Sequence, residues 1–405
     1  MKRNSPNHWL GPLLAILVAQ IAVTFLARLA PTLAPALSVR MQWNVTDIGL
    51  LSSIVAGGSV IFSLVGLPLV ARAGPVRSLQ AGLLVGAIGT LLYAVPSSAG
   101  PVIGSFLLGV AAGPQSAAGS DVLRRYAPVG SHNLIFSIKQ AGVPIAGMLA
   151  GLSMPGLAVS IGLPATFWVC ALLAIVTLMA MQPLQRQLDQ TRDPSQTIHP
   201  RLLVSIANLQ RPLRALADNA NLGRIAAAGT FFAIGQGVWF TFLISYLVLY
   251  LRMSLPAAGA LFALMQAVSA FGRPAMGWLA DRLGARAVLM AASIASALTT
   301  VALALLTPQW PNWAVVALVV AGGCTVSSWN GVQGAQTAHF SRPGAVAEST
   351  TGASLLIFLA NIAGPAVFGA IVALGGDFRL GFWLAALCTL AALVPLSRLP
   401  GAAGR

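Results

Sequence analysis

Runs of apolar residues, each about 20 residues long, recur along the whole chain and are separated by short polar stretches. A run of this length crosses the hydrocarbon core of a bilayer as a helix. Strands of a membrane barrel would alternate apolar and polar positions, and no such alternation occurs. The pattern therefore predicts an all-α membrane protein with twelve transmembrane helices. We place them at residues 11–37, 46–70, 76–95, 100–123, 133–157, 164–181, 222–250, 255–276, 286–306, 313–338, 345–373 and 378–397.

One long hydrophilic segment, residues 182–221, divides these spans into six and six. We expect an N-terminal six-helix bundle over 1–181, a cytoplasmic linker, and a C-terminal six-helix bundle over 222–405. Within the linker, "IHPRLLVSIANLQRPLRAL" places apolar residues at helical intervals with arginines between them. This pattern is typical of a helix lying in the headgroup plane, and a plain solvated linker is the alternative.

The Lys and Arg residues fix the expected orientation, because cytoplasmic loops hold the excess. With the N-terminus inside, the outer loops carry only Arg40, Arg252 and Arg379. We therefore expect a multi-pass protein of the cell membrane with both termini cytoplasmic. The start "MKRNSPNHW" leads into a run as long as the later ones, so we interpret it as the first retained span.

Composition agrees with a membrane protein, with 57% hydrophobic and 8% charged residues and a mean hydropathy of +0.84. The net charge of +15 is spread over short loops, which argues against a nucleic-acid surface. The three cysteines are scattered in apolar runs and form neither a disulfide framework nor a metal site. Without a phosphate-binding loop or a nucleophile with its base, we predict no enzyme and no cofactor.

The two halves resemble each other in order. "GLP" at 66–68 matches "GRP" at 272–274, Gln115 matches Asn330, and "KQAGVP" at 139–144 matches "ANIAGP" at 360–365. Internal duplication of this kind is how many transporters build a site near the bilayer midplane.

The stretch "GWLADRLGAR", residues 277–286, follows span 8 and resembles the loop signature of the major facilitator superfamily. The resemblance covers nearly the whole chain and implies a twelve-helix transporter working by alternating access. It implies that Asp281 joins a charge network with Arg282, Arg286 or a helix end. It also implies that Gly277 and Gly284 allow close packing and a tight turn, and that Arg273 supports this loop.

Two departures from that family pattern stand in the first half. The corresponding stretch "GLPLVARAGPVR" has no aspartate between Gly66 and Gly74, so we expect a weaker cytoplasmic contact there. In span 4, Ser105 stands where the family often has arginine. In span 10, "SSWNGVQGAQ" is similar to bacterial facilitators that take up small organic or inorganic anions.

Three cations fall inside the predicted spans, Arg28, Lys139 and Arg273, whereas none of the eight acids lies near the middle of a span. A charge at mid-bilayer costs about 2.5 to 3.5 kcal/mol, so such groups normally face a cavity or have a partner. An exporter of cationic drugs needs an embedded carboxylate, and a cationic cavity instead favours a negatively charged substrate. For Arg28, the alternative to a role in the cavity is an outer gate or snorkelling to the membrane surface. For Lys139, the alternative is snorkelling to the cytoplasmic surface.

Uncharged polar groups on the expected cavity-lining spans complete the candidate substrate site. They are Gln115, Gln140, Gln236, Trp239, Gln266, Asn330, Gln333 and Asn361. Amides donate hydrogen bonds to oxyanions, and each amide alone is also a common bond between helices.

The sequence thus predicts a secondary transporter of a small organic anion, a mono- or dicarboxylate, by symport or exchange, acting as a monomer. Protons are a candidate coupling partner. A multidrug exporter is the first alternative, and a membrane sensor that moves no ligand is the second.

Overall fold

The computed structural model describes residues 9–115, 118, 119, 122, 126, 132–195, 198, 206–217, 219–342, 346–374 and 377–400. The helices of the first half are α1 (Leu10–Ala27), α2 (Leu29–Thr32), α3 (Ala34–Met41), α4 (Val45–Val65), α5 (Leu67–Ala73), α6 (Pro75–Leu92), α7 (Ala99–Ala112), α9 (His132–Ser160) and α10 (Leu163–Leu188). Those of the second half are α12 (Ile206–Ala217), α13 (Ala220–Leu249), α14 (Leu255–Leu283), α15 (Ala285–Leu305), α16 (Asn312–Cys324), α17 (Asn330–Phe340), α18 (Val346–Ala373), α19 (Phe378–Ala391) and α20 (Leu393–Ser397).

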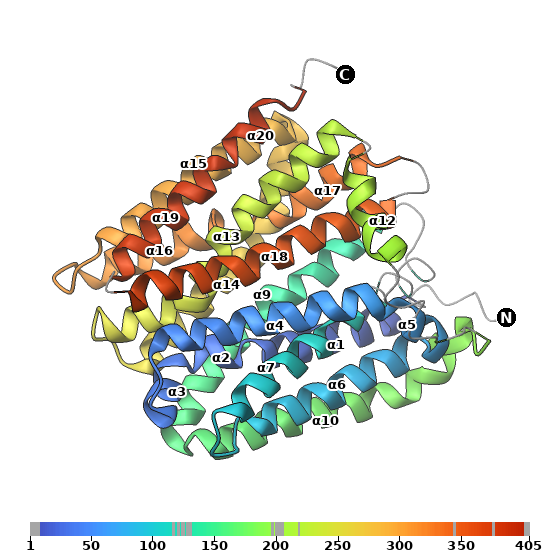
Figure 1. Cartoon of the computed structure of the whole chain (residues 1–405), viewed down its shortest axis with the longest axis horizontal. Coiled ribbons are helices and arrows are strands. Elements are labelled where there is room, and N and C mark those ends of the chain that lie inside the picture. Colours follow the sequence, from blue (N-terminus) through green and yellow to red (C-terminus); the bar gives the residue numbers. More distant parts are fainter. Residues whose placement is uncertain are drawn as a thin grey trace.

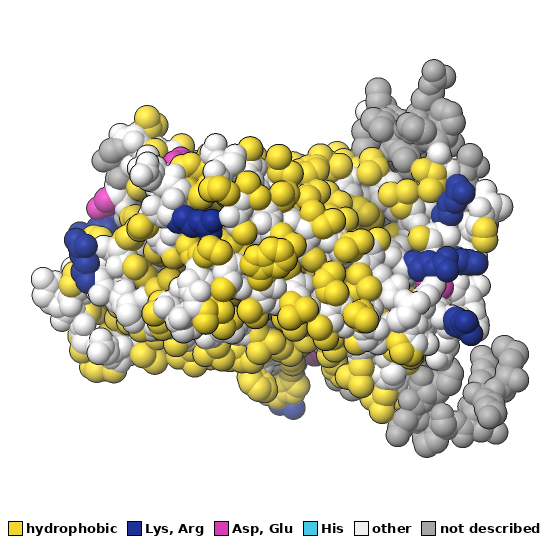
Figure 2. Space-filling model, turned by 90° about the horizontal axis from the view of Figure 1, so that it is seen from below, with side chains coloured by type: hydrophobic (Ala, Val, Ile, Leu, Met, Phe, Trp, Pro, Cys, Tyr) yellow, Lys and Arg dark blue, Asp and Glu magenta, His cyan; other side chains and the backbone are white. Residues whose placement is uncertain are grey.

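The predicted all-α membrane fold is confirmed. Ten helices of the described part are long and apolar enough to span a membrane, and α7 and α16 are shorter apolar helices at the places of spans 4 and 10. Figure 2 shows a broad apolar band across the middle of one side of the molecule, with most of the basic side chains toward its two ends. Such a band is what a bilayer core requires of the surface it contacts.

Two predicted spans are interrupted in the structure. Span 1 is divided at Arg28 and Leu33 into α1, α2 and α3, next to Pro31 and Pro35, because proline cannot donate to the helix ladder. Span 10 is broken between α16 and α17, where the Thr325 and Ser328 hydroxyls donate to backbone carbonyls of the preceding turn at 2.7 Å. Hydroxyls that bond the backbone in this way compete with regular helix.

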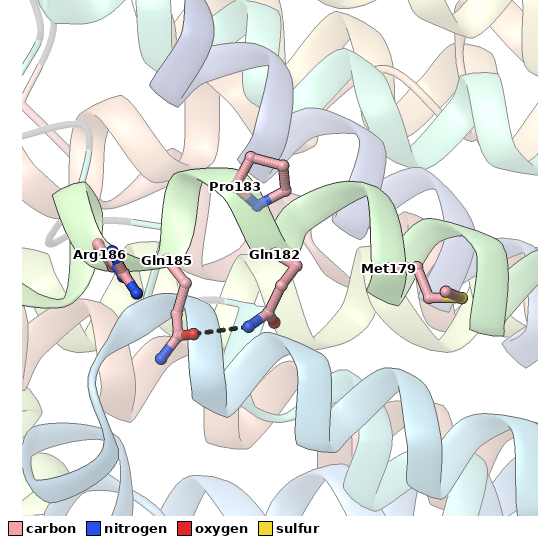
Figure 3. A pocket seen from close by; sticks show the side chains of 5 residues that line it. All are labelled: Met179, Gln182, Pro183, Gln185 and Arg186. Atoms are coloured by element: carbon pink, nitrogen blue, oxygen red, sulfur yellow. Dashed lines mark hydrogen bonds between the residues drawn. The ribbon is translucent and has the colours of Figure 1, made fainter.

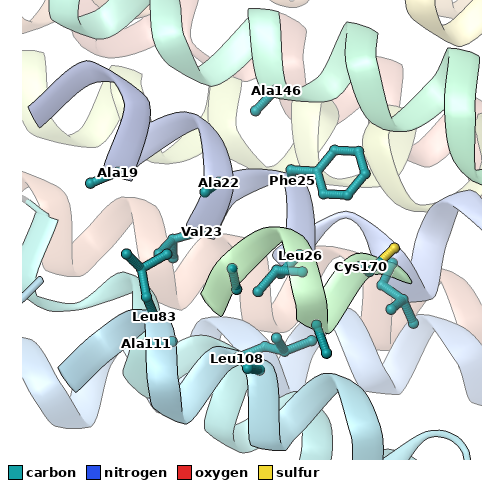
Figure 4. Packing of buried hydrophobic residues seen from close by; sticks show 14 of the residues in the cluster. Ala19, Ala22, Val23, Phe25, Leu26, Leu83, Leu108, Ala111, Ala146 and Cys170 are labelled. Carbon is teal, nitrogen blue, oxygen red and sulfur yellow. The ribbon is translucent and has the colours of Figure 1, made fainter. Parts of the chain in front are cut away.

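The two halves have separate hydrophobic cores. Figure 4 shows the first, where α1 lies among α6, α7, α9 and α10, and all its buried members fall within residues 15–188. The cores of the second half fall within residues 216–399. In Figure 1, α1–α10 lie below α13–α20. This arrangement supports the predicted division, whose boundaries at 181 and 222 stay a prediction.

The linker segment contains a helix, as its apolar spacing indicated. Of the predicted pattern, residues 199–205 lie outside the described part, and α12 begins at Ile206. This helix lies against α18 and α13, and Leu216 is buried there. The helix of span 6, α10, continues to Leu188 and so extends past its predicted end at 181.

The halves contact each other mainly through two helix pairs, α9 with α14 and α4 with α18 (Figure 1). Gly151 of α9 meets Gly259 of α14 so closely that a Cβ at Gly151 would lie 2.6 Å from the Gly259 carbonyl oxygen. In the other pair, Ser53 of α4 donates to the Ile362 carbonyl of α18 at 2.7 Å. The small residues let the helices approach backbone to backbone. These contacts hold the halves together toward the end of the molecule that the charge pattern assigns to the outside.

Candidate functional site

Arg28 reaches across the interface between the halves. It is half-buried at the break between α1 and α2, and its guanidinium carbon lies 4.3 Å from the centre of the Phe240 ring on α13. Its Nε is buried and has no hydrogen-bond partner among the described residues. The ring face offers the cation partial compensation. A donor that can still bond an oxygen is therefore held at the boundary of the two halves.

Arg273 crosses the same interface from the other side. From α14 it donates through Nε to the Ser327 carbonyl and through Nη1 to the Gln140 carbonyl on α9, both at 3.3 Å. The sequence placed Arg273 with the loop at 277–286, whereas its hydrogen bonds go to the break in span 10 and to the opposite half. The side chain of Gln140 is exposed.

Arg28 and Arg273 are both cations held at the interface of the halves, each in contact with the opposite half. Within the described part, neither they nor Lys139 has a carboxylate partner. The described acids lie at helix ends or in loops, namely Asp47, Asp189, Asp193, Asp281 and Asp377. The side chains of Asp121, Asp218 and Glu348 lie outside the described part. Among the described residues, the cations where the halves meet have no acidic partner.

Lys139 and Gln115 form a buried polar group inside the first half. Lys139 on α9 is 6% exposed, and its Nζ donates to the Gln115 carbonyl at 3.2 Å. It lies against Gly119, where a Cβ would come within 2.8 Å of Nζ. The Gln115 side chain donates to the Ala19 carbonyl of α1 at 3.1 Å, and its Oε1 is buried without a partner among the described residues. The ammonium therefore points into the bundle and does not snorkel to the surface.

Gln20 belongs to the same region and is absent from the predicted site. It is 4% exposed on α1, one residue after the carbonyl that holds Gln115, and its Oε1 also lacks a partner within the described chain. An amide inside an apolar span was the available signal. The junction of α1 and α9 therefore holds an ammonium group and two amide oxygens that accept no hydrogen bond from any described residue.

The amides of the second half form a group of their own. Gln236 on α13 donates to the Asn330 side chain at 3.2 Å, and Asn330 donates back at 3.4 Å. Asn361 on α18 packs against α13, because its Oδ1 would lie 2.8 Å from a Cβ at Gly237. Gln333 is buried against α13 and donates to Thr337 on its own helix at 3.2 Å. The structure thus brings Gln236, Asn330 and Asn361 together around α13.

Trp239 does not belong to this group, contrary to the prediction. It is fully buried, and its indole N–H donates to the Thr300 hydroxyl of α15 at 2.9 Å. A Cβ at Gly322 of α16 would meet its ring. The indole therefore packs inside the second half and offers no wall to a substrate between the halves.

The loop after α14 agrees with the prediction only in part. Gly284 has φ +86°, a conformation that favours glycine, and joins α14 to α15. Asp281 is exposed and makes no hydrogen bond or ion pair with any described residue, so the expected charge network is not formed. Arg282 stacks on Trp278 at 4.1 Å, and Arg286 donates to the Leu399 carbonyl at 2.9 Å.

Gly277 is the other correction in this loop. A Cβ at Gly277 would meet no atom within 4 Å, so this glycine is not needed for close packing of α14 against a neighbouring helix.

The corresponding turn of the first half has an acid that the local sequence lacks. Gly74 has φ +96° and precedes α6. Asp189, which directly follows α10, accepts from the backbone N–H groups of Val76 at 2.7 Å and Arg77 at 3.3 Å. The Asp193 N–H also donates to the Ala71 carbonyl at 2.9 Å. The expected weak contact is therefore replaced by a carboxylate supplied from the start of the linker.

The sequence of this chain is similar to those of known proteins. The family model described as Major Facilitator Superfamily matches residues 13–351 and 225–402. Two uncharacterised MFS-type transporters of Mycobacterium tuberculosis are each 26% identical over 407 residues, covering 95% of this chain and 85% of the relative.

Solved transporters share the fold. The nucleoside transporter NupG superposes with a TM-score of 0.74 at 16% identity, over 95% of this chain and 99% of that one. A peptide transporter, POT, gives 0.74 at 14% identity, over 98% and 95%. A bacterial homologue of the human lysosomal transporter Spinster, inward-facing and unoccupied, gives 0.67 at 16% identity, over 97% and 96%.

Proposed function

The chain belongs to the major facilitator superfamily, and from this premise we propose that it carries a small organic anion by alternating access. Mono- and dicarboxylates are the substrate class we favour. The observation that carries the proposal is the set of Arg28, Lys139 and Arg273, cations inside spanning helices without a described carboxylate partner. A buried charge needs compensation, and an anionic cargo would provide it.

The two arginines would couple substrate binding to the relative movement of the halves. Arg28 rests on Phe240 of the opposite half, and Arg273 bonds Gln140 of the opposite half. An anion bound by both would compensate their two positive charges and connect the halves. Guanidinium groups bind carboxylates with two parallel hydrogen bonds, so a carboxylate is a suitable partner for either arginine. Symport with protons and exchange of anions are both compatible with this proposal.

A stabilisation screen tests the proposal directly. The purified protein is heated with a panel of mono- and dicarboxylates and with neutral and cationic compounds at matched ionic strength. A ligand at 100 times its Kd stabilises the folded state by about 2.7 kcal/mol, which raises the melting temperature measurably. The stabilising compound is then used in counterflow assays in proteoliposomes.

We expect stabilisation and flux with anions only. Arg28→Ala and Arg273→Ala should abolish the stabilisation, whereas Arg252→Ala, in an exposed outer loop, should leave it intact. Stabilisation by neutral or cationic compounds alone, together with their flux, would replace this proposal by the multidrug alternative. Binding without any flux would favour a sensor.

A further inference from the structure

A surface hollow lies at the C-terminal end of α10, away from the interface of the halves. Its volume is about 450 Å³, and it is lined by Met179, Gln182, Pro183, Gln185 and Arg186 (Figure 3). No acidic side chain lines it. The charge pattern assigns this end of α10 to the cytoplasmic membrane surface.

The polar wall of the hollow is an ordered chain of amides. Gln80 on α6 donates to Gln182 at 2.8 Å. Gln182 donates to Gln185 at 3.0 Å, as Figure 3 shows. In the alternative orientation of the Gln185 amide, which gives up the bond from Gln182, the Gln185 oxygen lies 3.1 Å from Nη2 of Arg77, which would then donate to it. Arg186 is exposed and forms no hydrogen bond with the described residues. The hollow thus has one free guanidinium and a second one at its edge.

An apolar stripe leads into the hollow along the same side of α10. Leu172, Val176 and Met179 are 61%, 54% and 66% exposed. Their spacing of four and three residues continues through Pro183 to Arg186, so all five positions share one side of the helix. At 1.5 Å per residue, Arg186 lies about 10 Å beyond Met179. An apolar strip of surface therefore ends in a cationic, amide-lined hollow.

We propose that this hollow binds the headgroup of an anionic phospholipid, with an acyl chain lying along Leu172, Val176 and Met179. The guanidinium of Arg186 would bind the phosphate, and the amides of Gln182 and Gln185 would bond its oxygens or the glycerol hydroxyls. The nearby acid, Asp189, does not line the hollow, and its oxygens accept the backbone N–H groups of α6. A free soluble anion would leave the adjoining apolar stripe unused, which is why we favour a lipid.

The test uses the full-length purified protein, delipidated in a neutral detergent and titrated with phosphatidylglycerol or phosphatidylcholine. Native mass spectrometry counts the bound lipids. We expect wild-type protein to bind phosphatidylglycerol more tightly than phosphatidylcholine. Arg186→Gln should weaken phosphatidylglycerol about fivefold, which corresponds to about 1 kcal/mol for one basic residue at a membrane surface. Met179→Gln, which interrupts the stripe but keeps the charge, should weaken both lipids.

Arg192→Gln is the matched control, because Arg192 is exposed nearby and does not line the hollow. It should leave the preference unchanged. An equal loss in Arg192→Gln would reduce the effect to general surface charge and overturn the site. Equal binding of both lipids by wild-type protein, or an unaltered Arg186→Gln, would also overturn it. Displacement of the lipid by inorganic phosphate at millimolar concentration would identify a soluble-anion site instead.

Discussion

At the scale of single residues, the buried environment of Lys139 determines what its substitution should do. Lys139→Met keeps the approximate length and removes the charge. If the proposed anion binds there, its affinity should fall by one to two decades. This fall corresponds to the loss of a hydrogen bond to a charged group, which contributes about 1.5 to 3 kcal/mol. Isothermal titration of purified protein with the anion found in the stabilisation screen measures this. Unchanged affinity would remove Lys139 from the binding site.

The same environment makes arginine a poor replacement. A Cβ at Gly119 would already lie within 2.8 Å of the Lys139 ammonium, so the larger guanidinium has little room. We expect Lys139→Arg to bind the anion no better than Lys139→Met and to lower the melting temperature by several degrees. Gly119→Ala should also lower the melting temperature. Full affinity in Lys139→Arg would show that the pocket around the ammonium can expand.

Residue type and position in a span could be predicted, but the direction of each side chain around its helix could not. Lys139 and Gln115 were both expected in the site, and the structure places them in contact. Trp239 was expected beside them, yet it points to α15, because a tryptophan in an apolar helix fits either side equally well. Gln20 went unrecognised for the same reason: only packing shows that its oxygen is left without a donor.

At the scale of helices and turns, Asp189 acts as a cap for α6 from a distant part of the chain. Capping side chains contribute about 0.5 to 2 kcal/mol. Asp189→Ala removes both acceptors and should lower the melting temperature, whereas Asp189→Asn keeps one acceptor oxygen and should lose less. Differential scanning fluorimetry of the purified variants checks the order. Equal stability of Asp189→Ala and wild type would show that the cap contributes nothing.

The pH dependence of that cap has a definite sign. Burial raises the pKa of the Asp189 carboxyl above its ordinary value, although the Val76 and Arg77 backbone N–H groups act against the rise. A raised folded-state pKa means that the folded protein favours the protonated Asp189 carboxyl. The stability gained from this proton is fully present at low pH and is lost as pH rises through that pKa. The melting temperature of wild type minus that of Asp189→Asn should therefore grow as pH falls from 7 toward 4. A difference that is flat, or that shrinks on acidification, would contradict this prediction.

Hydrophobic runs were sufficient to predict the spanning helices but not their interruptions. Averaged hydropathy is insensitive to five residues such as 325–329, whose hydroxyls replace part of the helix ladder. The acid of the first-half turn could not be predicted either. Asp189 is separated from Val76 by 113 residues, and only the folded arrangement of α6 and α10 brings them together.

At the scale of the whole molecule, the predicted orientation can be tested with two single cysteines. Gln309, between α15 and α16, and Gln190, after α10, are both exposed and lie at opposite ends of the helices. In a background without Cys170, Cys324 and Cys388, an impermeant maleimide added to intact cells should label Gln309→Cys and spare Gln190→Cys. Permeabilised cells provide the control in which both react. The reverse labelling pattern would invert the orientation and the inside and outside assignments made here.

At the interface between the halves, the closed arrangement leaves the whole side-chain amide of Gln266 unsatisfied among the described residues. Gln266 on α14 is fully buried against Gly147 of α9, and neither its Nε2 nor its Oε1 has a hydrogen-bond partner among the described residues. An unsatisfied buried polar group costs about 1 to 3 kcal/mol. If the halves separate here during alternating access, water would satisfy the amide. Gln266 therefore favours opening of the predicted outer end.

Gln266→Met keeps the volume and removes the unsatisfied group, so it should shift the molecule toward the closed arrangement by about 1 to 3 kcal/mol, or roughly 5- to 150-fold. Gln266→Glu should shift it the other way, because burying a carboxylate costs more than burying an amide. Double electron–electron resonance measures the separation of the halves between two spin labels. The labels are attached at Val39→Cys on α3 and Leu374→Cys after α18, both largely exposed positions. We expect the long-distance population to shrink with Met and to grow with Glu. Shifts in the same direction, or none, would mean that this amide does not bias the transport cycle, and the cost of burying it would have to be compensated within the closed state itself.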